Sequence, residues 1–266
     1  MNSCELTAKE IMCVAASLGA TELYGIPDGF SGISKSSLNK ELLKVQNSLE
    51  QKGYLTENFD GDASLNQDLI NIILVCAKCE KFIAIDKQIK HKQQEGILYY
   101  VKGDTTVRAI KDGETYKMSI FDTSMIISSL NELVEWKEPD NNDSVEFTVS
   151  NKILVKAKTL KARQADDAAI SELRNIGVGD KVAKVIVSGL NGNEDFYSFT
   201  FANLIAQSDN IDNVMYIVSN DKALRLKSAI EDEQDVVHFT TASHEGVLSE
   251  LKAMLEKLAV SGEVFQ

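Results

Sequence analysis

An internal repeat is the feature that most limits how this chain can fold. The segment ILYYVKGDTTVRAI from Ile97 matches VMYIVSNDKALRLK from Val214. Matched residues lie 117 positions apart in the sequence (216 less 99), as in Tyr99 and Tyr216, Asp104 and Asp221, and Arg108 and Arg225. The step becomes 118 (239 less 121) further along, where Phe121 and Leu130 match Phe239 and Leu248. Because such self-similarity reflects repeated supersecondary units, the chain is expected to contain one unit twice.

The periodicity of apolar residues predicts helices followed by an antiparallel meander and a closing helix in each half. Thr7 and Glu10 form a capping-box pattern at the start of the first helix. The predicted helices lie at about 8–18, 36–52, 65–79, 124–134, 151–160, 180–190 and 244–258. The predicted strands lie at 82–85, 97–101, 106–110, 116–121, 195–202, 214–219, 222–228 and 235–241.

A polar stretch from Trp136 to Asp143, with one of only two prolines, is the best linker between the two halves. It divides the chain into a first repeat at 1–138 and a second at 144–266. A short meander cannot cover its own edges, so the two copies are expected to join in one sheet. The predicted fold class is α+β, with a pseudo-twofold duplicated unit and a central antiparallel sheet flanked by helical bundles.

Composition argues against several classes of function and assigns none. The net charge of −12 repels phosphate backbones, so nucleic acid is a disfavoured partner. No apolar run reaches the roughly 20 residues that a membrane helix needs, and the N-terminus has no signal-peptide pattern, so we expect a cytoplasmic protein without membrane insertion. Four cysteines fit a reducing compartment.

The first repeat also contains a winged-helix-like segment from Ser34 to Asp62. A predicted helix is followed by LEQKGYL and a polar stretch that could form a β-hairpin. In a DNA-binding regulator such a helix would enter the major groove while basic residues hold phosphates. The lysines here are offset by five acidic residues (Glu41, Glu50, Glu57, Asp60 and Asp62), which favours packing or protein contact. DNA-binding regulation is kept as the alternative function.

Candidate reactive residues are few. Cys76 and Cys79 form a CxxC, which could hold zinc or cycle as a disulfide. The chain offers no second CxxC or paired histidines to complete a zinc site, and this CxxC ends an apolar helix, so buried packing cysteines are the preferred interpretation. No glycine-rich phosphate loop or hydrolase motif occurs. We therefore expect no enzyme activity, no metal site and no cofactor.

The two turns at the ends of the repeated hairpins are the candidate partner-binding sites. They are copy-equivalent but differ in charge, and a symmetric scaffold that binds one partner must differ between its copies somewhere. The residues are Lys111, Asp112, Gly113 and Glu114 in the first copy, and Glu231, Asp232, Glu233 and Asp235 in the second.

A known family is similar to this chain in the order of its elements. The opening ELTAKEIMCVAASLG, the later L..KGYL before an acidic stretch, and an apolar helix ending VCAKCEKFIAID resemble the EspG family of type VII secretion chaperones. The resemblance implies an acidic cytosolic protein with a pseudo-twofold sheet and no catalytic motif. It also implies a partner, a small helical secreted protein or toxin, that the chaperone keeps soluble for export. The resemblance assigns no individual contact residue and no oligomeric state.

Overall fold

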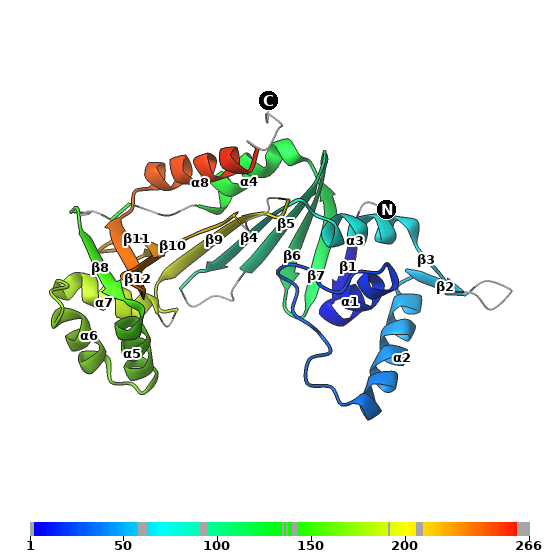
Figure 1. Cartoon of the computed structure of the whole chain (residues 1–266), viewed down its shortest axis with the longest axis horizontal. Helices are drawn as coiled ribbons and strands as arrows, with labels where there is room; N and C mark the ends of the chain where they lie inside the picture. Colours follow the sequence, from blue (N-terminus) through cyan, green and yellow to red (C-terminus); the bar gives the residue numbers. More distant parts are fainter. Residues whose placement is uncertain are drawn as a thin grey trace. The chain divides into compact units, whose positions relative to one another are not determined.

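A computed structural model describes residues 3–57, 63–90, 95–134, 136, 138–139, 143–190, 192–205 and 210–259. Within these residues the fold is α+β, with a ten-stranded antiparallel sheet and eight α-helices (Figure 1). The strand order is β1-β7-β6-β5-β4-β9-β10-β11-β12-β8, and a separate pair, β2-β3, forms a small second sheet. The predicted fold class is therefore confirmed at the level of α+β with a central antiparallel sheet.

The first compact unit comprises residues 1–84, 96–125 and 202–210. Its hydrophobic core lies between the sheet and three helices and includes Leu6, Ile73, Tyr100 and Met118, each almost fully buried. The helices of this unit are α1 (Ala8–Ser17), α2 (Lys35–Gln51) and α3 (Gln67–Ala77). Its strands are β1 (Ser3–Thr7), β2 (Leu55–Glu57), β3 (Ala63–Leu65), β6 (Thr105–Asp112) and β7 (Thr115–Phe121), with most of β5 (Glu95–Lys102) and part of β4 (Lys81–Gln88).

The second compact unit comprises residues 85–95, 126–201 and 211–266. Helices α5 (Asn151–Ala162), α6 (Asp166–Arg174) and α7 (Asp180–Gly189) pack on one face of its strands, around Leu173, Ile186 and Phe239. Helices α4 (Ile126–Leu133) and α8 (His244–Ala259) cover the other face (Figure 1). The strands are β8 (Glu146–Ser150), most of β9 (Asp195–Asn203) and β10 (Asn210–Val218), β11 (Ala223–Glu231) and β12 (Gln234–Thr241).

Each half of the strand order contains the same series of elements. An edge strand leads into a helix, further helices follow, and a four-stranded meander then returns to pair its last strand with the edge strand. β1 and β8 are these edge strands, and sequence periodicity did not predict either of them as a strand. They are only five residues long and run directly into helices, which leaves no alternating pattern to detect.

The repeated segment occupies matching ladder positions in the first hairpin of each meander. Tyr99 lies opposite Arg108, and Tyr216 lies opposite Arg225. In the second half of the chain, Arg225 and Tyr216 both bind Glu250 of α8, with the Tyr216 hydroxyl donating over 2.8 Å and the Arg225 Nε over 2.6 Å. This triad joins β10 and β11 to the helix that covers them.

In the second hairpin of each meander, structurally matching residues are not separated by the 118 positions that the sequence match indicates. Arg108 lies opposite Ser119, whereas Arg225 lies opposite Thr240, a step of 121 (240 less 119). An odd change of register moves a side chain to the other face of a sheet. Phe121 accordingly packs against Tyr99 and Arg108, while Phe239 enters the core beneath α5, α6 and α7. The matched phenylalanines are not structurally equivalent.

A buried carboxylate ties α1 to the end of α2. The predicted capping box forms, because Glu10 accepts from the Thr7 N–H over 2.6 Å and the Thr7 hydroxyl accepts from the Glu10 N–H. Glu10, only 2% exposed, also accepts from Ser48 and Lys52. Burial would raise the pKa of Glu10, but the hydrogen bonds from Lys52, Ser48 and Thr7 outweigh it and hold the pKa below its usual value.

Replacing Glu10 by Gln is expected to lower the free energy of unfolding by about 2 kcal/mol at neutral pH, since three donors lose their charged acceptor. Because the folded-state pKa is lowered, the contribution of Glu10 is present above its unfolded value of 4.5 and is lost as the pH falls through the folded value. Urea unfolding of both proteins between pH 7 and pH 3 measures this.

Glu41→Gln is the matched control, because Glu41 bonds Lys9 and Lys44 on the surface of the same helical pair. It should cost less than Glu10→Gln at pH 7. Equal losses in the two variants would contradict the special role of the buried carboxylate.

Candidate partner-binding surface

The tip of the β6–β7 hairpin is compact and close to neutral. Gly113 has φ of +60° and Glu114 does not, which is the pattern of a type II′ turn. Lys117 contacts Asp112 at 2.7 Å, and this hydrogen bond raises the pKa of Lys117. With Lys111 and Glu114 also exposed, charges of both signs alternate around the tip. Together with Lys117, the four predicted residues therefore form one small, charge-balanced surface.

The tip of the β11–β12 hairpin differs in charge and in backbone conformation. Asp232 and Glu233 have φ of +47° and +64°, so both central residues adopt the left-handed region of a type I′ turn. This turn favours Asn-Gly, and a larger side chain there costs of order 1 kcal/mol. Glu231 and Asp235 flank it, which leaves a strained tip with only acidic charges.

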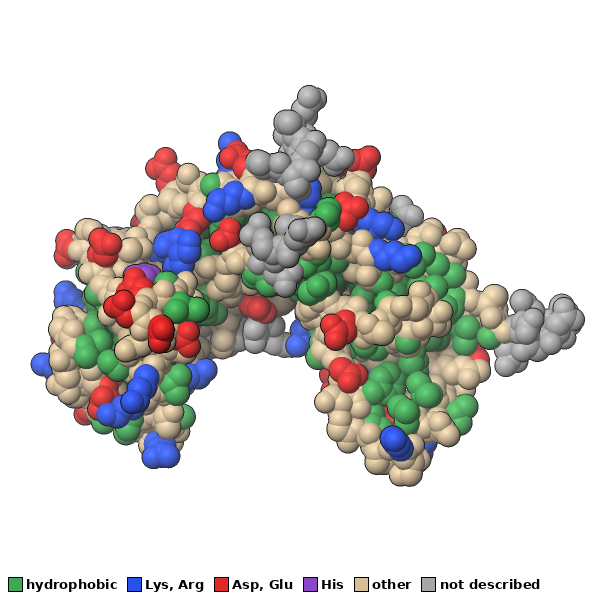
Figure 2. Space-filling view, in the orientation of Figure 1, with side chains coloured by type: hydrophobic (Ala, Val, Ile, Leu, Met, Phe, Trp, Pro, Cys, Tyr) green, Lys and Arg blue, Asp and Glu red, His purple; other side chains and the backbone are tan. Residues whose placement is uncertain are grey.

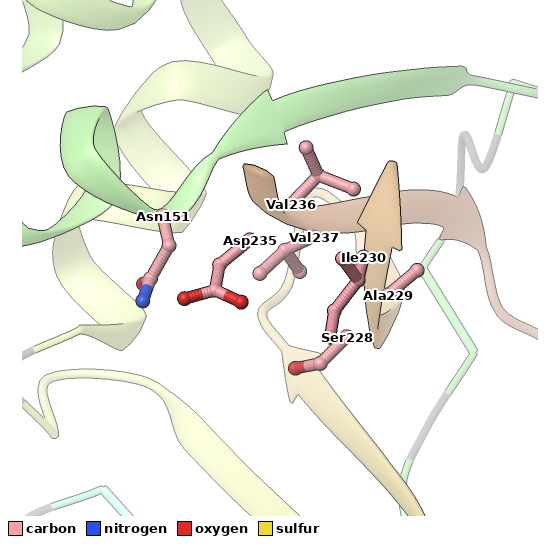
Figure 3. Close-up of a pocket in the computed structure, with 7 residues that line it drawn as sticks. All are labelled: Asn151, Ser228, Ala229, Ile230, Asp235, Val236 and Val237. Carbon is pink, nitrogen blue, oxygen red and sulfur yellow. The ribbon is translucent and has the colours of Figure 1, made fainter. Parts of the chain in front are cut away.

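A hollow of about 290 Å³ lies beside this acidic tip (Figure 3). The residues that line it come from β11, β12 and the first turn of α5: Asn151, Ser228, Ala229, Ile230, Asp235, Val236 and Val237. Ile230 is 77% exposed, the most exposed large apolar side chain among the described residues. An exposed isoleucine, an apolar-lined hollow and a group of carboxylates therefore share one end of the second unit.

His238 connects this tip to the neighbouring edge strand. Its Nε2 lies 3.0 Å from the Glu231 carboxylate, and its Nδ1 lies 3.0 Å from the Thr148 hydroxyl of β8. Three strands are thereby joined close to the acidic turn. Sequence reasoning found the acidic residues of this site but missed Ile230, Asn151 and His238. The available signal was an isoleucine directly before an acidic turn, where a solvated hairpin tip would favour a polar residue.

The cysteines occupy the core of the first unit rather than a reactive site. Cys4 and Cys76 are buried, while Cys13 and Cys79 are partly covered. Burial raises the pKa of Cys4 to about 12 and that of Cys79 to about 11, and it raises the pKa of the other two thiols as well. A protonated thiol is a poor nucleophile and a poor metal ligand. Within the described ranges, no three His, Cys, Asp or Glu side chains group as a metal site would require.

Two further features bear on the sequence predictions. Across the described ranges no helix has both the length and the apolar character that a bilayer crossing demands. The winged-helix-like segment predicted at Ser34 to Asp62 contains α2 and β2, and β2 pairs with β3 just beyond that segment, from Leu55↔Leu65 to Glu57↔Ala63. Residues 58–62 of that segment, and much of the predicted linker, lie outside the described residues.

Glu233→Gly is expected to stabilise the chain by about 0.5–1 kcal/mol, because glycine adopts positive φ without steric cost. Glu114→Gly is the matched control, since Glu114 does not have positive φ and should gain nothing. Thermal unfolding of the two variants compares them. A gain of stability at Glu114 and none at Glu233 would contradict the turn assignment.

The four thiols are expected to react slowly with a thiol-specific chromogenic disulfide at pH 8 and completely after denaturation. Burial and the raised pKa of each thiol keep the nucleophilic thiolate scarce in the folded chain. Time courses in buffer and in guanidinium measure the difference. Rapid reaction of Cys76 or Cys79 in the native protein would refute the packing role.

Comparison with known proteins places these features in a known fold. No protein-family model and no curated protein matches the chain. Among solved structures, the Mycobacterium tuberculosis type VII secretion chaperone EspG5, in complex with the PE25–PPE41 dimer, aligns over 96% of both chains with a TM-score of 0.58 and 10% identity. HtdX from the same organism aligns with a TM-score of only 0.17, which supports no argument. The chain has the fold of the chaperone EspG5, so the resemblance that its sequence suggests is confirmed at the level of fold.

Proposed function

We propose that this protein is a non-enzymatic cytosolic chaperone or adaptor that binds a helical type VII secretion substrate and keeps it soluble for export. The observation that carries the proposal is the EspG5 fold, which extends over nearly the whole of both chains. That chaperone was solved with the PE25–PPE41 dimer. For this chain the partner is a small helical secreted protein or a toxin.

The proposed contact surface is the acidic end of the second unit. Ile230 offers an apolar side chain that a partner can cover, and the hollow beside it can accept an apolar side chain in return. The carboxylates of Glu231, Asp232, Glu233 and Asp235 would select a partner with lysine or arginine around its apolar tip. The presence of two acidic residues in a turn that favours glycine is consistent with a function for their charge.

We also propose that the fold arose by duplication, with repeats at 1–138 and 144–266. Support comes from the shared element order, from the common register of Tyr99 with Arg108 and Tyr216 with Arg225, and from helix starts that directly follow both edge strands. Within the part of the chain that the structure describes, a pair like β2–β3 occurs in the first series only. The winged-helix-like segment would then be an addition used for packing or protein contact.

The charges of that segment do not favour the DNA-binding alternative. Lys44 contacts Glu41 at 2.5 Å and Lys52 contacts Glu10 at 2.8 Å, so both cations already have acidic partners. Figure 2 shows acidic and basic side chains interspersed on the visible face rather than a continuous basic stripe. With two of its four lysines already paired, the segment offers few cations for the phosphate contacts that dominate DNA affinity.

The test is co-expression of the full chain with small helical proteins encoded beside it in its own genome, followed by size-exclusion chromatography. A stable complex with one of them is expected. Ile230→Asp should weaken that complex by at least about tenfold, the loss typical of an interface anchor. Replacing Asp232 and Glu233 by Asn and Gly should weaken it while leaving the fold intact.

Leu43→Asp is the matched control, because Leu43 is 60% exposed on α2 in the other unit. It should bind as well as the parent chain. A complex that tolerates Ile230→Asp but not Leu43→Asp would overturn the assigned surface. Failure to bind any such protein, together with a gel shift on duplex DNA at low salt, would overturn the proposed function in favour of the alternative.

A further inference from the structure

The two edge strands of the sheet differ in whether their outward backbone groups are covered. On β1, the Glu5 N–H donates to the Tyr54 hydroxyl over 3.1 Å, and Lys52 Nζ donates to the Glu5 carbonyl over 3.1 Å. Tyr54 and Lys52 follow α2, whose end lies against this strand. Side chains therefore satisfy the backbone at the centre of the β1 edge, which protects it from pairing with another chain.

On the β8 edge, outward-pointing backbone N–H and C=O groups lie at the position that matches Glu5 of β1. The Thr241 N–H donates to the Val145 carbonyl, so the backbone of every second residue from Val145 points toward β12. The N–H and C=O groups of Glu146 and Thr148 consequently point away from the sheet. Among the described residues, no hydrogen bond reaches these outward backbone groups. Thr148 corresponds to Glu5, because Ser150 and Thr7 both precede a helix as its N-cap.

The two residues that cover the β1 edge have apolar counterparts in the second half. The end of α6 repeats the end of α2, since Gly177 and Gly53 both have positive φ and the next N–H bonds the carbonyl five residues back in each case. At this cap Val178 stands where the first copy has Tyr54, and Ile176 stands where it has Lys52. Neither can bond a backbone group, and Ile176 is 43% exposed.

The β8 strand is complementary to a second copy of itself. In an antiparallel pair centred on Thr148, Phe147 would lie opposite the partner's Val149 on the apolar face. Glu146 would lie opposite the partner's Ser150, so the twofold axis opposes no like charges even though the chain carries a net charge of −12. Phe147, which stacks on Phe239 at 5.0 Å but remains partly exposed, would become covered.

We propose that the β8 edge is an interaction surface for a second copy of this chain, which pairs antiparallel through Thr148 to form a twofold dimer. The outward N–H and C=O of Thr148 bond the same groups of the partner, and the exposed Ile176 side chains add apolar contact at the rim. The strand has only five residues, so the interface is small and the dimer is weak and concentration-dependent.

Analytical ultracentrifugation of the full chain from low micromolar to near-millimolar concentration tests the proposal. A reversible monomer–dimer equilibrium is expected. Thr148→Pro removes the outward N–H without removing a bond to β12, and it should weaken dimerisation by at least about tenfold. Thr148→Val keeps the backbone donor and should still dimerise, although it loses the hydroxyl contact with His238.

A second variant tests the edge without altering the strand. Ile176→Lys restores the cation found in the first copy, and it should shift the equilibrium toward monomer by covering the Thr148 carbonyl. Val155→Lys is its matched control, since Val155 is 57% exposed on α5 and should leave the dimer unchanged. Circular dichroism confirms that each variant is folded.

Cross-linking tests the register directly. Thr148→Cys brings two thiols together across the axis, where the Cα atoms of a hydrogen-bonded pair are about 5.5 Å apart, and should form a disulfide-linked dimer on mild oxidation. In this register residue 146 of one copy lies opposite residue 150 of the other, four residues away from residue 146. Glu146→Cys should therefore not form the disulfide. A monomer at every concentration overturns the proposal, and so does a dimer that survives both Thr148→Pro and Ile176→Lys.

Discussion

The pairing of each meander with a strand that precedes its helices is the constraint on which this architecture depends. β1 pairs with β7 from Ser3↔Ser119 to Thr7↔Thr115, and β8 pairs with β12 from Val236↔Ser150 to Thr240↔Glu146. Because each edge strand continues directly into a helix, the ladder also determines where that helix starts. α1 and α5 are thereby held against the apolar face of their own meanders, where Leu6 and Val149 contribute to the two cores.

Strong local patterns made most of the helices and the meander strands predictable, although they did not indicate α6. Alternating apolar residues and turn glycines indicated β5, β6 and β7, and the Thr7–Glu10 pattern indicated the capping box at α1. The residues that pair across neighbouring strands were harder to predict from the sequence. The match of Phe121 with Phe239 aligned two apolar residues that face opposite sides of the sheet, because β11 and β12 extend further beyond Arg225 than β6 and β7 extend beyond Arg108. Sequence similarity records which side chains are apolar, whereas register depends on hairpin length.

The acidic residues of the candidate site were visible in the sequence because charge is a property of the residue itself. The hollow and the exposure of Ile230 were not, since both depend on how the β11–β12 tip sits beside the start of α5. The role of His238 was also hidden, because Glu231 and Thr148 reach it from two other strands. The proposed duplication suggests a practical rule, which is to interpret each residue beside its proposed counterpart, such as Lys52 beside Ile176 and Tyr54 beside Val178.

The distance in sequence between β1 and its partner has a consequence for synthesis. Residues 3–7 leave the ribosome long before residues 115–119 exist, so β1 is made early but is among the last strands of its unit to be paired. During that interval Leu6 and Cys4, which are buried in the finished protein, have no sheet to cover them. The capping box requires only Thr7 and Glu10, so α1 can begin without β7. Bulk inserted directly before β1 is thus unfavourable, because it must be accommodated when the sheet finally closes.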